Sequence, residues 1–111
     1  MKYATLYKIV KETVTELCGS WNVTELCNTQ VPFTFNDCIH SINDCIHFDF
    51  GCQSYYINVD DTTFDEPYII IYQPIIENKM CVGYKCRRFI DTDHKSQIEL
   101  AVNICTAIIN L

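Results

Sequence analysis

The sequence has very little glycine and lacks the short motifs of most enzymes. Only Gly19, Gly51 and Gly83 occur in 111 residues. Phosphate-cradling loops need clustered glycines that let backbone amides approach the ligand, so neither a Walker A loop nor a dinucleotide-binding fingerprint can be drawn. The Gly-x-Ser-x-Gly and His-Glu-x-x-His patterns of hydrolases are also absent. We therefore expect a non-enzymatic protein with no cofactor and no catalytic residues.

Long apolar runs are absent as well. The longest, Tyr68 to Tyr72, has five residues, far below the ~20 that a membrane-spanning helix needs. Lys2 and Lys8 interrupt the apolar residues near the N-terminus, so no secretory signal is recognisable. The eight cysteines are therefore expected to be mostly free, buried thiols in the reducing cytoplasm of a bacterial or host cell. We expect no interaction with a membrane.

Positive charge is missing from the middle of the chain. Between Lys11 and Lys79 there is no lysine or arginine, whereas the same stretch holds eleven acidic residues. The formal net charge of −6 argues against nucleic-acid binding, because phosphate contacts need a basic footprint. A surface of one sign attracts partners of the other sign. The sequence therefore predicts an interaction protein that binds a basic protein surface.

The candidate partner-binding residues are acids of a predicted connection between two strands, together with two acids that precede it. They are Asp44, Asp49, Asp60, Asp61, Asp65 and Glu66. A small acidic protein can inhibit nucleic-acid-binding machinery by occupying its phosphate-binding groove, and phages and viruses use such inhibitors. By this analogy of charge and size, the main hypothesis is a stoichiometric inhibitor of phage or viral type. The competing interpretation is that the acids only keep the domain soluble.

Cysteine and histidine suggest an alternative, a small metal-binding or redox-responsive domain. Cys38, His40, Cys45, His47 and Cys52 cluster in the sequence. On a helix, Cys38 and Cys45 would stand roughly 10 Å apart, too far to share one ion. On a strand, Cys45 and His47 would share a face. The sequence has no Cys-x2-Cys pair, so buried thiols and surface imidazoles are the preferred interpretation and no metal ligand is assigned.

A short basic run near residue 86 is the one feature that favours direct contact with nucleic acid. Lys85, Arg87 and Arg88 are flanked by Tyr84 and Phe89, and aromatic rings beside arginine can form a stacking platform for bases. Basic residues in a strand more often mark a charged sheet edge that prevents aggregation. We prefer this second interpretation.

Another alternative is a homodimeric structural or chaperone-like module. Tyr55, Tyr56 and Tyr72 lie in predicted strands, and tyrosine is enriched at protein interfaces. In this interpretation, exposed strands pair two copies of the chain and the three tyrosines anchor the interface. The sequence leaves both a monomer and a homodimer open.

The pattern of apolar residues predicts a single α+β domain over residues 1–111. Apolar residues at three- and four-residue steps predict helices over residues 3–18 and from residue 94 to the C-terminus. Two-residue alternation predicts strands over residues 54–60 and 80–90, and residues 36–50 fit either type of element. The continuous apolar run from Tyr68 predicts a central strand over residues 68–73, and Pro74 to Lys79 are expected to form the connection that returns the chain. The expected architecture is an antiparallel sheet of three to four strands, flanked by N- and C-terminal helices that cover one face.

Four details of packing accompany this fold. Gly19 is expected to end the first helix in the left-handed conformation, and Trp21 and Leu26 are expected to pack inside. Asp93 is expected to cap the last helix. The predicted buried stripe of that helix is Ile98, Ala101, Val102, Cys105, Ile108 and Ile109.

Overall fold

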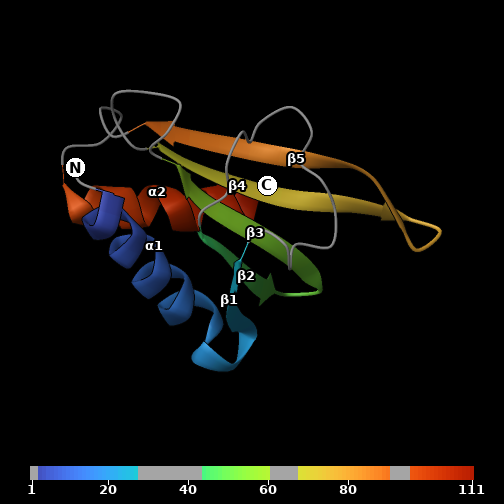
Figure 1. The fold of residues 1–111 in the computed structure, drawn as a ribbon, viewed down its shortest axis with the longest axis horizontal. Coiled ribbons are helices and arrows are strands. Elements are labelled where there is room, and N and C mark those ends of the chain that lie inside the picture. Colours follow the sequence, from blue (N-terminus) through green and yellow to red (C-terminus); the bar gives the residue numbers. More distant parts are fainter. Residues whose placement is uncertain (1–2, 28–43, 61–67, 91–95) are drawn as a thin grey trace.

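The computed structural model describes residues 3–27, 44–60, 68–90 and 96–111, which contain two α-helices and a five-stranded antiparallel sheet (Figure 1). Two helices flank the strands in the sequence, as predicted. In chain order the elements are α1 (Tyr3–Cys18), the 3-10 turn η1 (Ser20–Asn22), β1 (Val23–Cys27), β2 (Asp44–Phe50), β3 (Gln53–Asp60), β4 (Tyr68–Glu77), β5 (Met80–Ile90) and α2 (Gln97–Asn110).

The sheet is a meander in which each strand pairs with the next one along the chain. The strand order is β1-β2-β3-β4-β5, and every pair is antiparallel. The predicted α+β class is therefore confirmed, although the sheet has five strands rather than three to four. Sequence reasoning missed β1, because its five residues, Val23–Cys27, are too few to show a period. Within the ambiguous range 36–50, residues 44–50 form β2, and residues 36–43 lie outside the described residues.

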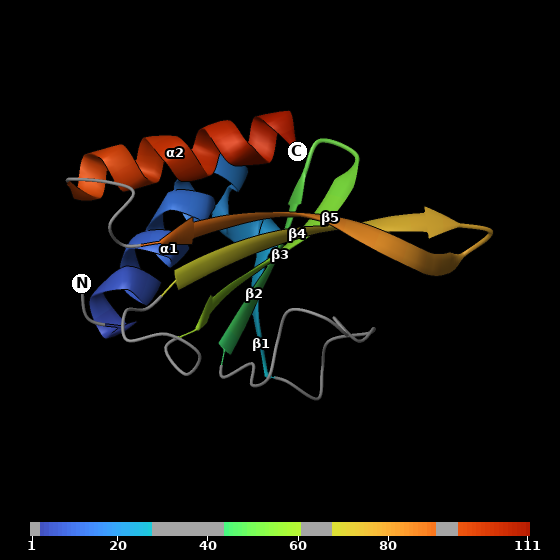
Figure 2. The same cartoon turned by 90° about the horizontal axis from the view of Figure 1, so that it is seen from above.

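The main core lies between the helices and one face of the sheet (Figure 2). The stripe predicted for α1 is confirmed, since Leu6, Ile9, Val10, Thr13 and Val14 are buried. The Thr13 hydroxyl donates a hydrogen bond to the Ile9 carbonyl oxygen at 2.7 Å, so this buried polar group is satisfied. The sheet residues that face the helices are Ile46, Phe48, Tyr55, Ile57, Val59, Ile69, Ile71 and Phe89.

The opposite face of the sheet is apolar at its centre too. A second buried cluster on that face consists of Cys45, Tyr56, Tyr68, Ile70 and Tyr72. As a result, β4 is buried on both faces from Tyr68 to Tyr72. This double burial explains why the strand reads as a continuous apolar run, and it confirms the prediction of an interior strand.

The three tyrosines predicted as interface anchors belong to these cores. Tyr55 stacks on Phe48 with ring centroids 5.3 Å apart on the helix-covered face, and Tyr56 and Tyr72 are buried on the other face. The prediction that they anchor a dimer is therefore wrong. Alternation along a strand indicates which residues share a face, but both faces are buried here.

The segment after α1 differs in part from expectation. Gly19 has the expected positive φ of 84°, which favours glycine, but its ψ of 145° lies outside the left-handed helical region. The Trp21 side chain is 98% exposed, so the prediction that it packs inside is wrong. Leu26 is half-buried against the second cluster, as expected. Trp21 falls in the η1 turn, where the chain reverses from α1 into β1 and leaves the indole in solvent.

Helix α2 begins later than predicted and buries a different stripe. Ser96 is the N-cap, because its hydroxyl accepts a hydrogen bond from the Glu99 amide at 3.1 Å, whereas Asp93 lies outside the described residues. The buried residues are Leu100, Ile104 and Ile108, so only Ile108 of the predicted stripe is fully buried. The predicted stripe was wrong, since the other members are half-buried or exposed; those that are exposed are Ile98, Val102 and Ile109.

Strands β4 and β5 continue past the end of β3. The last β3–β4 pair is Tyr56 with Tyr72, and beyond it residues 74–84 form a two-stranded projection, which we call the arm (Figures 1 and 2). The prediction that Pro74 begins a connecting segment was wrong. Pro74 lies beyond the last β3–β4 pair, so its missing amide hydrogen interrupts no ladder on that side. Asn78 and Lys79, with φ of 51° and 65°, form the turn, as in tight hairpins.

Candidate functional site

The charges that are segregated along the sequence are also segregated across the sheet. Because the strand order follows the chain order, neighbours in sequence stay neighbours in space. Strands β1 to β3 carry acidic residues and no lysine or arginine, whereas the β4–β5 hairpin is mostly basic. In chain order these residues are Glu25, Asp44, Asp49 and Asp60, then Glu77, Lys79, Lys85, Arg87 and Arg88. The sheet therefore has an acidic side at β1–β3 and a basic edge at β5.

The six predicted partner-binding acids do not form one patch in the described residues. Asp44 begins β2 and Asp60 ends β3, and the pairing of Cys45 with Asn58 places both aspartates at the same end of the sheet. Asp49 lies five residues further along β2, about 17 Å away by strand geometry. The other three, Asp61, Asp65 and Glu66, lie outside the described residues.

Glu25 lies beside a lysine of the first helix. Its Oε1 lies 2.6 Å from the Lys11 Nζ of α1. The hydrogen bond from Lys11 lowers the pKa of Glu25. Both side chains are about half exposed, so the pair mainly neutralises Glu25 and adds little stability. The charge of Glu25 is therefore largely cancelled on this side of the sheet.

Asp49 belongs to a small polar cluster on the face opposite the helices. Its Oδ1 accepts a hydrogen bond from the Ser54 hydroxyl at 2.7 Å and lies 3.6 Å from His47 Nε2. The His47 ring in turn lies 4.8 Å from the Tyr56 ring. In a serine hydrolase the histidine stands between the serine and the carboxylate. Here the carboxylate stands in the middle and accepts the Ser54 hydrogen bond itself, so the order of groups is not that of a catalytic triad.

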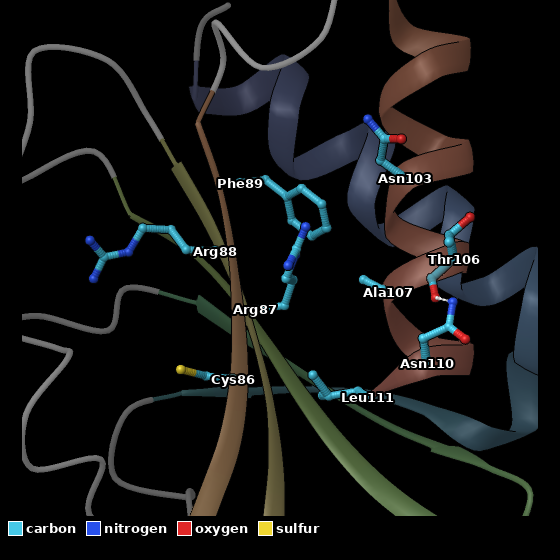
Figure 3. Close-up of a pocket in the computed structure, with 9 residues that line it drawn as sticks. All are labelled: Cys86, Arg87, Arg88, Phe89, Asn103, Thr106, Ala107, Asn110 and Leu111. Carbon is cyan, nitrogen blue, oxygen red and sulfur yellow. Dashed lines mark hydrogen bonds between the residues drawn. The ribbon is translucent and has the colours of Figure 1, made fainter.

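A hollow of about 530 Å³ lies between β5 and α2 (Figure 3). The side chains of Arg87 and Phe89 point toward α2, whereas those of Cys86 and Arg88 point away from it. This difference follows from the alternation of side chains along a strand. The residues that line the hollow from α2 are Asn103, Thr106, Ala107, Asn110 and Leu111.

The polar groups of this hollow are largely used within α2. Thr106 Oγ1 donates to the Val102 carbonyl oxygen at 2.8 Å, and Asn110 Nδ2 donates to the Thr106 carbonyl oxygen at 2.9 Å. No acidic side chain of the described residues pairs with Arg87. A cation beside the last turn of a helix stabilises its C-terminal carbonyl groups. We therefore interpret Arg87 as a structural cation for α2.

The basic run does not form the stacking platform considered from the sequence. Lys85 and Arg87 face the helix side of the sheet, whereas Arg88 lies on the other side, 5.3 Å from the centre of the Tyr68 ring. Phe89 is buried in the main core, and Tyr84 packs edge-on against a core tyrosine. A platform needs exposed rings beside the cations on one surface. The position of β5 at the sheet edge matches the preferred interpretation, a charged edge strand.

The arm carries the apolar surface that sequence reasoning missed. Ile75, Ile76, Met80 and Val82 are between 37% and 68% exposed. The available signal was the group of apolar residues on each side of residues 77–79. The sequence predicts a returning connection there, which does not indicate an apolar surface. Large apolar side chains that gather on a projection typically mark an interaction site.

The described part of the chain contains no assembled metal site. Among those residues, no group of three or more histidine, cysteine or acidic side chains could hold a metal ion. Cys45 and His47 do share one face of β2, but Cys45 is fully buried beneath its neighbours. Two residues of the sequence cluster, Cys38 and His40, lie outside the described residues.

The six cysteines whose side chains are described are free thiols in different environments. Cys45 is buried, and this burial raises its pKa to about 12. Burial also raises the pKa of Cys18 and Cys105. Cys52, Cys81 and Cys86 are exposed, so the expectation of buried thiols was wrong for these three. Cys52 and Cys81 lie in a turn and on the arm, outside both cores.

These environments predict a graded reaction with an alkylating reagent. At pH 8 the thiolate fraction of Cys45 falls about a thousandfold below that of a thiol with the usual pKa of 9, because each pKa unit is a factor of ten. We expect iodoacetamide to modify Cys52 and Cys81 rapidly and to leave Cys45 unmodified, as measured by peptide mass spectrometry. Denaturation in urea should make the three rates equal. Native modification of Cys45 at the rate of Cys52 would contradict its burial.

Comparisons of the chain with known protein families, with characterised proteins and with solved structures find no match. Neither of the described helices is long and apolar enough to span a membrane.

Proposed function

We propose that this chain is a non-enzymatic interaction protein whose acidic side docks on a basic protein surface. The observation that supports this function is the division of charge across the sheet, with the acids on β1–β3 and the basic edge on β5. An asymmetric distribution of charge orients a protein as it approaches a charged partner and raises the association rate. A uniformly acidic surface would give solubility but no preferred orientation.

The docking surface is proposed at the end of the sheet where β2 begins and β3 ends. Asp44 and Asp60 lie there, and Asp61, Asp65 and Glu66 follow Asp60 in the sequence. A basic surface that could bind several acidic residues at once is typical of proteins that bind nucleic acids, since such proteins must neutralise several phosphates. The proposed partner is such a protein, and the proposed action is stoichiometric inhibition by occupation of its phosphate-binding groove. An inhibitor of this phage or viral type acts in the cytoplasm of a bacterial or host cell.

A pair of variants with matched charge tests the proposal. Asp60→Lys with Asp61→Lys alters the proposed surface, and Glu12→Lys with Glu16→Lys makes the same change in net charge on the exposed side of α1. A tagged wild-type chain identifies its partner in extracts of the cells that produce it, and the purified partner is then used for titrations. We expect the first variant to weaken binding at least tenfold, and the second to change it less than about threefold.

Two further measurements define the mode of binding. The affinity of the wild type should fall steeply with salt, and the chain should compete with nucleic acid for the partner. Equal losses in both variants would show that only the net charge matters. Unchanged binding in the Asp60–Asp61 variant, with unchanged salt dependence, would refute the acidic docking surface.

A further inference from the structure

The arm exposes apolar side chains on both of its faces. In the β4–β5 pairing, Ile75 and Met80 lie on the side of the sheet that carries the helices, and Ile76 lies on the opposite side with Cys81. Val82 is the extra residue of a bulge between these pairs. Among the described residues, the third strand makes no pair with β4 beyond Tyr72, and the apolar side chains of the arm stay exposed. Apolar surface of this kind is typical of a site that another chain covers.

A groove of about 460 Å³ runs from the base of the arm toward its tip, on the face opposite the helices. Its floor and walls come from the β2–β3 turn, from β3 and from the arm itself. The residues that matter here are Cys52, Ser54, Tyr56, Pro74, Ile76 and Lys79. The exposed Ile76 side chain belongs to both features, because it lines the groove and also projects from the arm.

We propose that two copies of this chain associate about a twofold axis through their arms, each arm lying in the groove of the other copy. The two arms run antiparallel, so that the tip of one meets the base of the other. Ile76 of each copy then lies near the axis and fills the apolar part of the opposite groove. A surface that carries both the apolar projection and the apolar groove is self-complementary, which is the requirement for an isologous interface.

Charge favours the same arrangement. Lys79 lies at the tip of the arm, and Asp49 lies next to the groove residue Ser54, whose hydroxyl donates a hydrogen bond to Asp49 Oδ1 at 2.7 Å. In an antiparallel pair, Lys79 of one copy reaches the base of the other arm and meets the second copy's Asp49. A parallel pair would bring the two Lys79 side chains together instead. Asp49 of a second copy thus complements Lys79 of the first.

The charges also explain why the arms meet face to face rather than edge to edge. Lys85, Arg87 and Arg88 lie on β5, the free edge next to the arm. Antiparallel pairing of two β5 strands would place these like charges opposite each other, which is destabilising. A face-to-face contact leaves both basic edges in solvent. This inference does not depend on the proposed acidic docking surface, which lies at the other end of β2 and β3.

Sedimentation velocity of the full chain tests the inference. We expect the wild type to become dimeric as its concentration is raised to about 100 µM, since an interface with a micromolar dissociation constant is populated in this range. Ile76→Asp should weaken the dimer at least about a hundredfold, because it places a carboxylate in the apolar contact. Ile98→Asp is the control, since Ile98 is exposed on α2, far from the arm in the fold. That variant should remain dimeric, and circular dichroism should show both variants folded.

A charge exchange then tests the orientation of the arms. Lys79→Asp and Asp49→Lys should each weaken the dimer by about tenfold, and the two changes in one chain should restore it to within about threefold of the wild type. A wild type that stays monomeric throughout the range would overturn the inference. Dissociation by Ile98→Asp but not by Ile76→Asp would also overturn it, and would assign the contact to α2. Additive losses in the combined charge variant would rule out the antiparallel arrangement.

Discussion

Ile104→Ala is expected to lower the free energy of unfolding by about 3 kcal/mol, whereas Val102→Ala changes it by less than about 0.7 kcal/mol. Ile104 is fully buried between α2 and the sheet, and truncation leaves a cavity that the packed layers cannot close. Val102, two residues earlier on the same helix, is 58% exposed and loses little contact. Alanine also favours the helix more than valine does, which offsets part of that loss.

The two variants can be compared directly by urea unfolding, monitored through the helical circular dichroism signal. Equal slopes against urea concentration would show that both variants unfold from similarly compact states. The large difference between them distinguishes two possible orientations of α2. If Val102→Ala were the more damaging change, the stripe predicted from the sequence would face the sheet and the observed orientation would be wrong.

Asn58→Val is expected to raise the free energy of unfolding by about 1–2 kcal/mol. Asn58 is 1% exposed in β3, between Cys45 on β2 and Ile70 on β4. Neither its Oδ1 nor its Nδ2 has a hydrogen-bond partner in the described structure. A buried amide without partners loses its bonds to water and gains none in return. Valine removes this cost and suits a strand, because its branched side chain packs well on a pleated surface.

Asn58→Asp provides the matched opposite change, because aspartate has nearly the same shape. An unpaired carboxylate at this position is expected to lower the free energy of unfolding by several kcal/mol at pH 7. Burial raises the pKa of such a carboxyl group above its unfolded value, so the folded state binds the proton more tightly. The loss should therefore shrink as the pH falls. A loss of stability in Asn58→Val would instead show that the amide has a bonding partner in the native protein.

Several elements could be predicted because the information for them is local. The bounds of α1 match the predicted range, since a continuous stripe of apolar residues ends at a glycine with positive φ. The bounds of β5 match as well, with its alternating side chains. Tyr68 to Tyr72 was recognised as an interior strand because its residues are apolar without alternation. In these cases, neighbouring residues in the sequence carry the whole signal.

The errors occurred where a distant part of the chain decides the outcome. Helix α2 has apolar residues around more than half of its circumference, so its sequence contains two possible buried stripes. Only the contact with the sheet selects Leu100, Ile104 and Ile108. In the same way, Pro74 resembles the start of a turn until the end of β3 is known. The acids selected because they lie near one another in the sequence are partly separated, since Asp44 and Asp49 lie toward opposite ends of one strand.

The sequence by itself determined the types of the main elements, the α+β class and the division of charge along the chain. Each of these depends on composition or on short periodic patterns, which physical chemistry links directly to helix, strand or surface. Tertiary structure alone decided the meander order that turns the charge division into two sides of a sheet, the burial of Tyr55, Tyr56 and Tyr72, and the projection of the arm. These features depend on which strand ends beside which, and long-range pairing leaves no local pattern in the sequence.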